Sequence, residues 1–270
     1  MINPITRVPA VAGMFYPGSA AELTDAVRQF MANALAAPAG VPKALIVPHA
    51  GYVYSGPVAA SGYACLAAAR NLIKRVVLLG PTHRVAIRGL ALPAASAFDT
   101  PLGRVPLDGE LEQMVLRLPQ VQQNAMAHAQ EHSLEVQLPF LQMVLDEFTL
   151  LPLAVGMAST EEVAEVLDCV WGGKETLIVI SSDLSHYHPY SQAQQLDQET
   201  GRQIVALQPL ADHQQACGAT PVNGLLLCAR RRGLQAQLLD LRNSGDTAGD
   251  RSRVVGYGAF AFQESMAYGQ

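Results

Sequence analysis

Short apolar runs alternate with amphipathic stretches along the whole chain of 270 residues. The apolar runs, typical of buried strands, lie at 43–48, 75–80, 89–93, 149–155, 175–181, 234–241 and 253–262. Helical patterns lie near 20–36, 56–70, 108–118, 131–146, 160–171, 189–207 and 221–232. This alternation predicts an α/β fold with a mostly parallel central sheet and helices on both faces. No crossover helix separates the last two strands, so we expect them to pair antiparallel.

The domain organisation is expected to be simple, with one domain over residues 1–270. The chain has no internal repeat and no linker rich in proline, glycine or serine. Half of its residues are hydrophobic and 15% are charged, so a large core is available and disorder is not expected. The stretch around 93–106 is the longest one expected to be irregular.

Charge and hydropathy exclude two classes of partner. The net charge is −5, and the only basic run, Arg230–Arg232, ends an apolar segment where a helix dipole favours cations. We therefore expect no binding to nucleic acid. The N-terminus lacks the pattern of a secretory signal, and no apolar run approaches the length of a membrane span. The expectation is a soluble, cytoplasmic protein that does not bind a membrane.

The four cysteines are widely spaced and lie in apolar surroundings. They are Cys65, Cys169, Cys217 and Cys228, and no two of them form a C-x-x-C pair. We interpret them as small buried hydrophobic residues in a reducing compartment rather than as disulfides or a zinc site.

Histidines follow three of the predicted strands. His49 comes after 43–48, His83 after 75–80 and His186 after 175–181. A single histidine in such a place is most often a surface or hydrogen-bonded structural residue. Three in equivalent places are less easily accidental, because ligands of open α/β sheets bind beyond the carboxyl ends of the strands. The pattern predicts a metal or acid–base site there.

Two further segments offer polar groups for this site. Tyr52 and Tyr54 lie between Gly51 and Gly56, where their hydroxyls would bind a substrate oxyanion or would only pack a turn. Glu131 and His132 begin a predicted amphipathic helix, where Glu131 would contact substrate and His132 would be catalytic, or where both would support the ligands of the site from behind. The alternative is that these two residues only stabilise the helix dipole.

The segments after 175–181 and 234–241 complete the predicted site. Asp183 is placed to orient the imidazole of His186 for acid–base work. Asp246 would join His49 and His83 as a third metal ligand, and two histidines with one carboxylate suit non-haem Fe(II). Three histidines and one aspartate are interpreted as surface or loop residues outside the site: His128, His188, His213 and Asp250.

Five motifs along the chain resemble the Memo family. They are P-H-A-G-Y-V-Y-S-G at 48–56, G-P-T-H at 80–83, E-H-S-L-E-V-Q-L-P-F at 131–140, S-S-D-L-S-H at 181–186 and N-S-G-D at 243–246. The resemblance spans essentially the whole chain. Bacterial members of this family often accompany an AMMECR-type protein and a radical SAM protein, which the resemblance implies as partners. The family is similar in fold to the LigB-type extradiol non-haem iron dioxygenases.

The resemblance also implies roles for single residues. His49 and His83 correspond to the family's metal-ligand histidines, and Asp183 and His186 to the acid–base part of the same pocket. In animal members the third position is a cysteine, which the loop at 243–247 lacks, so either Asp246 or Thr247 would stand there.

The predicted function is a non-haem iron oxygenase or redox enzyme that acts on an aromatic or other small substrate. Its cofactor would be a divalent metal, with Fe(II) favoured over Cu or Zn. The alternative is a non-catalytic module that binds a metal, an anionic peptide or a metabolite in the same pocket.

Overall fold

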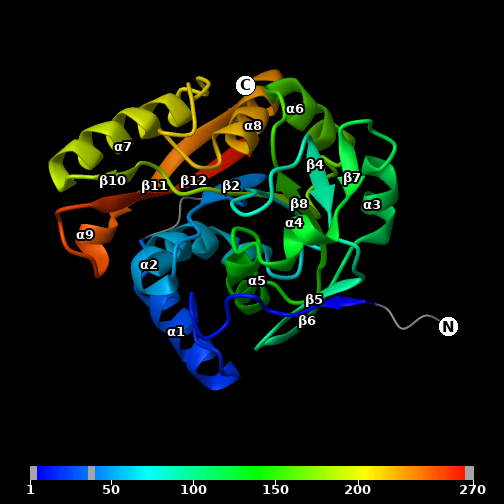
Figure 1. Ribbon diagram of the computed structural model, residues 1–270, viewed down its shortest axis with the longest axis horizontal. Coiled ribbons are helices and arrows are strands. Elements are labelled where there is room, and N and C mark those ends of the chain that lie inside the picture. The colour runs from blue at the N-terminus through cyan, green and yellow to red at the C-terminus, as the bar shows by residue number, and fades with distance from the viewer. Residues whose placement is uncertain (1–4, 36–39, 265–270) are drawn as a thin grey trace, which may run out of the picture.

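The predicted α/β class is confirmed by a computed structural model, which describes residues 5–35 and 40–264 (Figure 1). A mixed sheet of nine strands runs through the molecule. Its strands are β2 (Ala44–Val47), β3 (Arg75–Pro81), β4 (Leu90–Leu92), β7 (Val121–Gln123), β8 (Thr149–Val155), β9 (Thr176–Ser181), β10 (His186–His188), β11 (Leu234–Asn243) and β12 (Val254–Glu264). The likeness to LigB-type dioxygenases stays a prediction.

The order of strands places the parallel part of the sheet at its centre. The order is β10-β12-β2-β9-β3-β8-β4-β7, and β11 pairs with β12. The central strands β2, β9, β3 and β8 are parallel, as predicted from their continuous apolar runs. The pairing of β11 with β12 is antiparallel, also as predicted. The carboxyl ends of β2, β9 and β3 therefore lie side by side at one edge.

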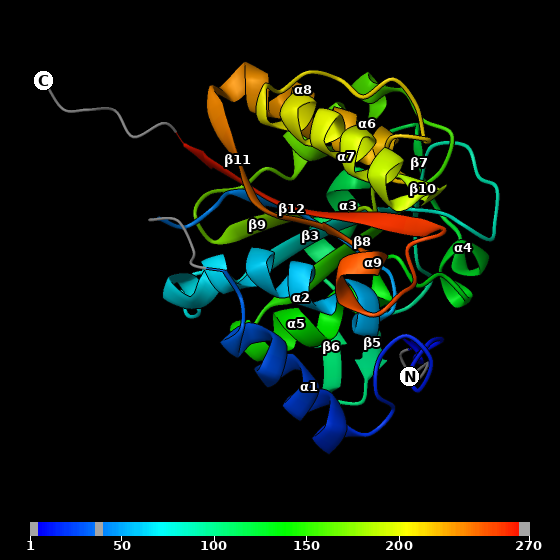
Figure 2. The same ribbon diagram turned by 90° about the vertical axis from the view of Figure 1, so that its left-hand side faces the viewer.

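Helices cover both faces of the sheet (Figure 2). On one face lie α1 (Ala20–Ala32), α2 (Tyr52–Tyr63), the 3₁₀ helix η1 (Ala64–Ala69) and α5 (Leu138–Val144). On the other lie α3 (Gly109–Val115), α6 (Thr160–Cys169), α7 (Tyr190–Val205) and α8 (Ala219–Arg232). Successive side chains of β2 point to opposite faces of the sheet. Leu45 and Val47 therefore belong to one core cluster, and Ala44 and Ile46 belong to the other. Shorter helices are α4 (Ala125–Ala129), η2 (Glu135–Gln137) and α9 (Ser244–Thr247).

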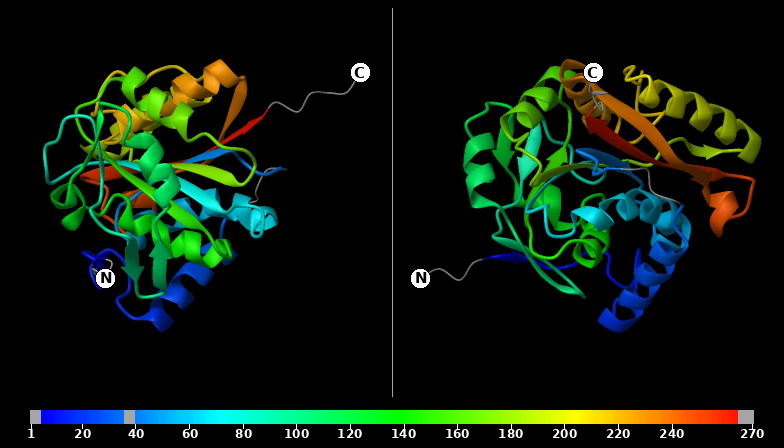
Figure 3. Two further views of the ribbon diagram at one scale, coloured as in Figure 1. Left: turned by 90° about the vertical axis from the view of Figure 1, so that its right-hand side faces the viewer. Right: turned by 180° about the vertical axis from the view of Figure 1, so that it is seen from behind.

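Two expectations about local structure were wrong. The stretch around 93–106 contains a hairpin of β5 (Ala97–Thr100) and β6 (Gly103–Pro106), which forms a second sheet with β1 (Thr6–Arg7) (Figure 3). Strand β1 lies near the N-terminus, far from β5 in the chain, and no local sequence pattern predicts that these two strands pair. The helix expected from residue 131 begins only at Glu135, and the Glu131 carboxylate accepts the backbone N–H groups of His132 and Ser133 in the segment before it. Of the helix expected at 20–36, residue 36 lies outside the described residues.

Other sequence expectations are met. Arg230–Arg232 form the last turn of α8, which ends at Gly233 in the left-handed conformation with a φ of 67°. All four cysteines are free thiols, but only Cys65 and Cys228 are buried as expected, while Cys169 and Cys217 are partly exposed. Within the described ranges, no helix is both long and apolar enough to cross a membrane.

A buried ion pair ties the N-terminal segment to the region before α5. The guanidinium of Arg7 bonds the carboxylate of Glu135, and both side chains are almost fully buried. Arg7 also donates to the carbonyl oxygens of His128 and Glu131, at 3.0 and 2.7 Å. The Glu135 carboxylate accepts further hydrogen bonds from the backbone of Val11 and the hydroxyl of Tyr16, at 3.0 and 2.6 Å. These contacts fix the chain on both sides of residue 132.

Replacing Arg7 by Met tests how far the fold depends on this pair. The substitution leaves the Glu135 carboxylate buried without its charge partner, so we expect the free energy of unfolding to fall by about 3 kcal/mol or more. Urea denaturation followed by circular dichroism measures the change. The control is Arg28→Met, because Arg28 is exposed on α1 and should cost less than about 1 kcal/mol. An equal loss in the two variants would contradict the prediction.

Candidate metal centre

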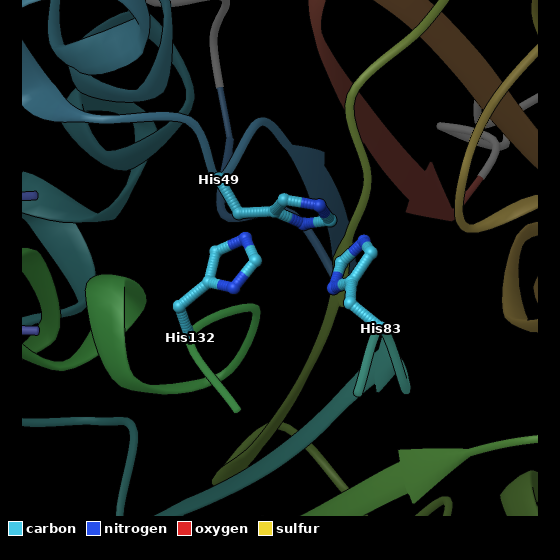
Figure 4. A group of neighbouring side chains, drawn as sticks. All are labelled: His49, His83 and His132. Carbon is cyan, nitrogen blue, oxygen red and sulfur yellow. The ribbon is translucent and has the colours of Figure 1, made fainter. Parts of the chain in front are cut away.

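Three imidazoles converge at the edge of the sheet where β2 and β3 end. They belong to His49, His83 and His132, and one ligand nitrogen of each lies within 4.8 Å of the other two (Figure 4). The ring centroids of His49 and His83 are 5.1 Å apart, and those of His83 and His132 are 4.7 Å apart. His49 and His83 were expected together as metal ligands. His132 was expected as a catalytic residue, but it lies with them in the third place of the group.

Strand register explains the meeting of His49 and His83. Val47 at the end of β2 pairs with Ser181 of β9, and Ile180 of β9 pairs with Leu79 of β3. Each chain then leaves the sheet at the same edge and delivers its histidine within a few residues. His132 arrives from the irregular segment between α4 and η2, which the sequence pattern had assigned to a helix.

A hydrogen-bond network determines which nitrogen of His49 carries the proton. The Ser181 hydroxyl donates to the carbonyl oxygen of Ser133 at 2.5 Å and accepts from the Gln137 amide at 2.8 Å. Its contact with His49 Nδ1, at 2.9 Å, must then be a bond that Nδ1–H donates. The lone pair of His49 is therefore on Nε2, the nitrogen that is available to a metal.

Glu131 orients His83 in the same way. Its carboxylate lies 2.8 Å from His83 Nδ1 and accepts the backbone N–H of His83 at 2.6 Å. It also accepts the backbone N–H groups of His132 and Ser133, each at 3.0 Å. A carboxylate that holds Nδ1–H leaves Nε2 free for a metal, which is a common arrangement around metal-binding histidines. Glu131 was expected to contact substrate, but the structure places it behind the histidines.

The protonation states suit metal binding. Burial lowers the pKa of His49 well below its usual value, and the neighbouring imidazoles of His83 and His132 add to this effect. Burial also lowers the pKa of His132 to about 4, although Glu131 acts in the opposite direction. Burial alone would raise the pKa of Glu131, but its hydrogen bonds with His83 and Ser133 outweigh this and lower it to about 2. At neutral pH, His49 and His132 are thus neutral donors beside a charged carboxylate, which fits a transition-metal ion.

A thiol that the sequence interpretation missed lies beside this group. Cys217, just before α8, places its Sγ atom 3.2 Å from Nε2 of His49. Burial raises the pKa of the Cys217 thiol, and the nearby carboxylate of Asp183 raises it further. Its sequence context resembles that of a buried structural cysteine, so no local signal distinguished it. The loop at 243–247 lacks a cysteine, but another segment of the chain brings one to the site.

Asp183 and His186 reach the site, but they do not contact each other as expected. The Asp183 carboxylate accepts the backbone N–H of His49 at 2.6 Å. His186 instead donates from Nδ1 to the carbonyl oxygen of Leu184 at 2.8 Å, which leaves its Nε2 as a free acceptor. Burial lowers the pKa of His186, so its imidazole is in the neutral form at neutral pH.

Asp197, on α7, holds the turn that carries His186. Its buried carboxylate accepts the backbone N–H of Ser185 at 3.0 Å. Gly256 on β12 bonds the same turn through its carbonyl oxygen and its N–H. A Cβ atom at residue 256 would lie 2.1 Å from Asp197 Oδ2, so only glycine fits there.

The two tyrosines expected to bind substrate differ in position. Tyr52 is buried in the core, and its hydroxyl donates to the carbonyl oxygen of Val136 at 2.6 Å. Tyr54 is 40% exposed and lines a pocket of about 850 Å³ that also contains His49, His83, His132 and His186. A second pocket of about 880 Å³ shares His83 and Cys217 with the centre.

Asp246, expected as the third ligand, lies apart from the histidine group. One of its carboxylate oxygens bonds the Tyr190 hydroxyl, and the other accepts the N–H of Asn243 at 3.0 Å. These bonds make Asp246 part of the capping box that begins α9. The Thr247 hydroxyl donates to the carbonyl oxygen of Ser244, and the Asp250 carboxylate binds Ser252. Local hydrogen bonding therefore accounts for the acidic and hydroxyl groups of this loop.

The remaining histidines are placed outside the cluster. His128 was expected on the surface but is buried, and its Nε2 lies 2.8 Å from the carbonyl oxygen of Ala91. His213 is exposed, as expected, and His188 is partly buried on β10.

The fold and the site together define an α/β protein with a histidine cluster, suited to a metal ion, at the strand ends of its sheet. Residues 7–261 match the family of Memo-like proteins. The chain is 35% identical to a MEMO1 family protein of Methanopyrus kandleri, over 95% of this chain and 99% of that one. It is 37% identical to a MEMO1 family protein of Aquifex aeolicus, over 93% and 97% of the two chains. The chain belongs to the Memo family.

Substitution of Glu131 by Gln tests its role in orienting His83. The uncharged amide holds Nδ1–H less firmly, so we expect affinity for Zn(II) to fall about 10- to 100-fold. Isothermal titration with Zn(II) measures this change without redox chemistry. Glu161→Gln, an equal change of charge at an exposed position of α6, is the control and should leave affinity unaltered. Unaltered affinity in Glu131→Gln would show that the carboxylate does not support the centre.

His128 provides a test of how acid destabilises the fold. Burial lowers its pKa from 6.5 to about 4. Between these values the unfolded chain binds a proton that the folded chain does not, so stability falls as pH drops from about 6.5 to 4. The difference corresponds to about 3 kcal/mol. Unfolding in urea at several pH values should show a shallower decline for His128→Gln than for the wild type. His213→Gln should keep the full decline, and a wild-type slope in His128→Gln would refute the assignment.

Proposed function

We propose that this protein is a mononuclear metal enzyme of the oxygenase or redox type, with Fe(II) held by His49, His83 and His132. The proposal rests on one observation, the convergence of three imidazoles within 4.8 Å at the strand ends of the sheet. Imidazole ligands suit Fe, Cu and Zn, so the donor set itself leaves Cu and Zn as alternatives. Three protein ligands leave positions open for small molecules, as catalytic sites require.

The surrounding residues support a role in catalysis rather than in structure alone. The cluster opens into the pocket of about 850 Å³, which is large enough for a small molecule and is lined by the aromatic rings of Phe15, Tyr54 and Tyr257. A bound Fe(II) ion would supply the redox chemistry needed to reduce dioxygen. In this arrangement His186 accepts a proton from the substrate at Nε2, since its Nδ1–H is held by Leu184. Cys217 is a further donor beside His49.

The metal set is tested by a matched pair of variants. Loss of a ligand costs more than loss of a supporting residue, so His132→Ala should lower affinity for Fe(II) by more than about 100-fold. Asp246→Ala should leave it unaltered, because the carboxylate of Asp246 serves the capping box. Anaerobic titration with Fe(II), followed by metal analysis after gel filtration, measures both. The reverse result would restore Asp246 as the third ligand.

Activity is tested separately from metal binding. Oxygen consumption by the Fe(II)-loaded protein is measured with catechol as an aromatic probe, and His186→Gln should reduce it about 100-fold or more while metal content stays the same. Full metal loading without oxygen consumption would contradict the oxygenase proposal and would favour a non-catalytic binding module.

A further inference from the structure

The pocket over the histidine cluster carries a pair of arginines that the proposed chemistry does not use. Arg84 follows His83 directly in the chain, and Arg253 comes from the start of β12, yet both line the pocket. Over residues 5–35 and 40–264, neither guanidinium forms an ion pair with a carboxylate. Arg251, in the same loop as Arg253, stacks on the ring of Tyr190 and does not line the pocket.

Arg253 packs against Tyr187, a residue with an unusual backbone conformation. Its guanidinium lies 5.1 Å from the ring centroid of Tyr187. Tyr187 has a φ of 62°, the left-handed region that residues other than glycine seldom adopt. The conformation arises where the register of β10 against β12 shifts between His186 and His188. Tyr187 is 63% exposed, and both it and His186 line the pocket. Backbone strain of this kind concentrates at functional sites.

The charges of the pocket favour an anion at this place. Asp250 is the exposed carboxylate of the lining, and it is already bonded to the backbone N–H and the hydroxyl of Ser252, at 2.7 and 2.5 Å. Asp183 also lines the pocket, but its carboxylate accepts the backbone N–H of His49 and lies buried at the strand ends. Two guanidinium groups therefore remain without an anionic partner beside a wall of aromatic rings.

We propose that the substrate is a small aromatic carboxylate, whose carboxylate group is bound by Arg253 and Arg84 while its ring lies against the aromatic wall. A planar guanidinium matches a carboxylate with two parallel hydrogen bonds, which orients the ligand as well as binding it. This inference rests on the proposed function, because it takes the histidine cluster as the reaction centre. It adds the class of substrate and the residues that select it.

Binding of benzoate and benzamide tests the proposal, since the two probes share a ring and differ in charge. Isothermal titration uses the full-length protein, both Zn(II)-loaded and metal-free. Wild type should bind benzoate about tenfold more tightly than benzamide, because the carboxylate gains charge-assisted hydrogen bonds. Arg253→Gln should weaken benzoate binding about tenfold and leave benzamide binding unaltered, in both forms of the protein. Arg84→Gln should act in the same direction.

Arg251→Gln is the matched control, since Arg251 lies in the same loop and also stacks on a tyrosine but does not line the pocket. It should bind benzoate like wild type. Equal affinity for the two probes, or an equal loss in Arg251→Gln and Arg253→Gln, would overturn the proposal. Benzoate binding that requires Zn(II) and has the same affinity in Arg253→Gln as in wild type would also overturn it, because the metal would then bind the anion. A protein that binds no metal but keeps Arg253-dependent benzoate binding would refute only the proposed function.

Discussion

The buried carboxylate of Glu131 is the group on which the arrangement of the histidines depends. A charged carboxylate inside a protein is costly unless hydrogen bonds compensate it, and here the backbone N–H groups of His83, His132 and Ser133 do so. The ring of His83 adds a further bond from Nδ1. One side chain therefore satisfies the start of the irregular segment and fixes two of the three imidazoles. The same bonds satisfy the first N–H groups of the segment that leads into η2, where the N–H of Val136 donates to the carbonyl oxygen of His132 at 3.1 Å.

Hydrogen bonds from other parts of the molecule hold the segment between α4 and η2 in place. Arg7 binds the carbonyl oxygen of Glu131 and the carboxylate of Glu135, and it belongs to β1 of the small second sheet. Ser181 of the central sheet binds the carbonyl oxygen of Ser133 and the ring of His49. The N-terminal strand, the central strands and the segment before α5 thus meet in one hydrogen-bonded network. A network of fully satisfied buried polar groups is rigid, and a rigid frame is what a metal site requires.

The centre that results differs from the one expected for a facial triad of two histidines and a carboxylate. Its nearest carboxylates do not point at the cluster as donors, because Glu131 is used by His83 and Asp183 by the backbone of His49. Glu131 acts from behind the imidazole of His83, where a carboxylate strengthens a ligand instead of being one, whereas Asp183 holds the backbone that carries His49. Cys217 places its sulfur atom beside His49, but this atom is not part of the group of three ligand nitrogens. Imidazole ligands suit Fe, Cu and Zn alike, so selection among these metals depends on the pocket and on availability in the cell as well as on the donors.

The sequence by itself determined the α/β class, the parallel centre of the sheet and the meeting of His49 with His83, because apolar runs encode buried strands and parallel strands share one edge. The sequence did not show that His132, and not Asp246, is the third member of the group with His49 and His83. The local pattern at 131–146 favoured a helix from residue 131, whereas in the fold Glu131 binds His83, 48 positions away in the chain, and the helical segment begins at Glu135. Asp246 lies in a loop whose local hydrogen bonds are as consistent with a cap as with a ligand. The positions of Cys217 and Arg253 at the site likewise depend on tertiary packing, which brings Cys217 beside His49 and Arg253 beside Tyr187. Periodicity along the chain reports which side of an element is buried, whereas the partners of a buried polar group are decided by tertiary packing.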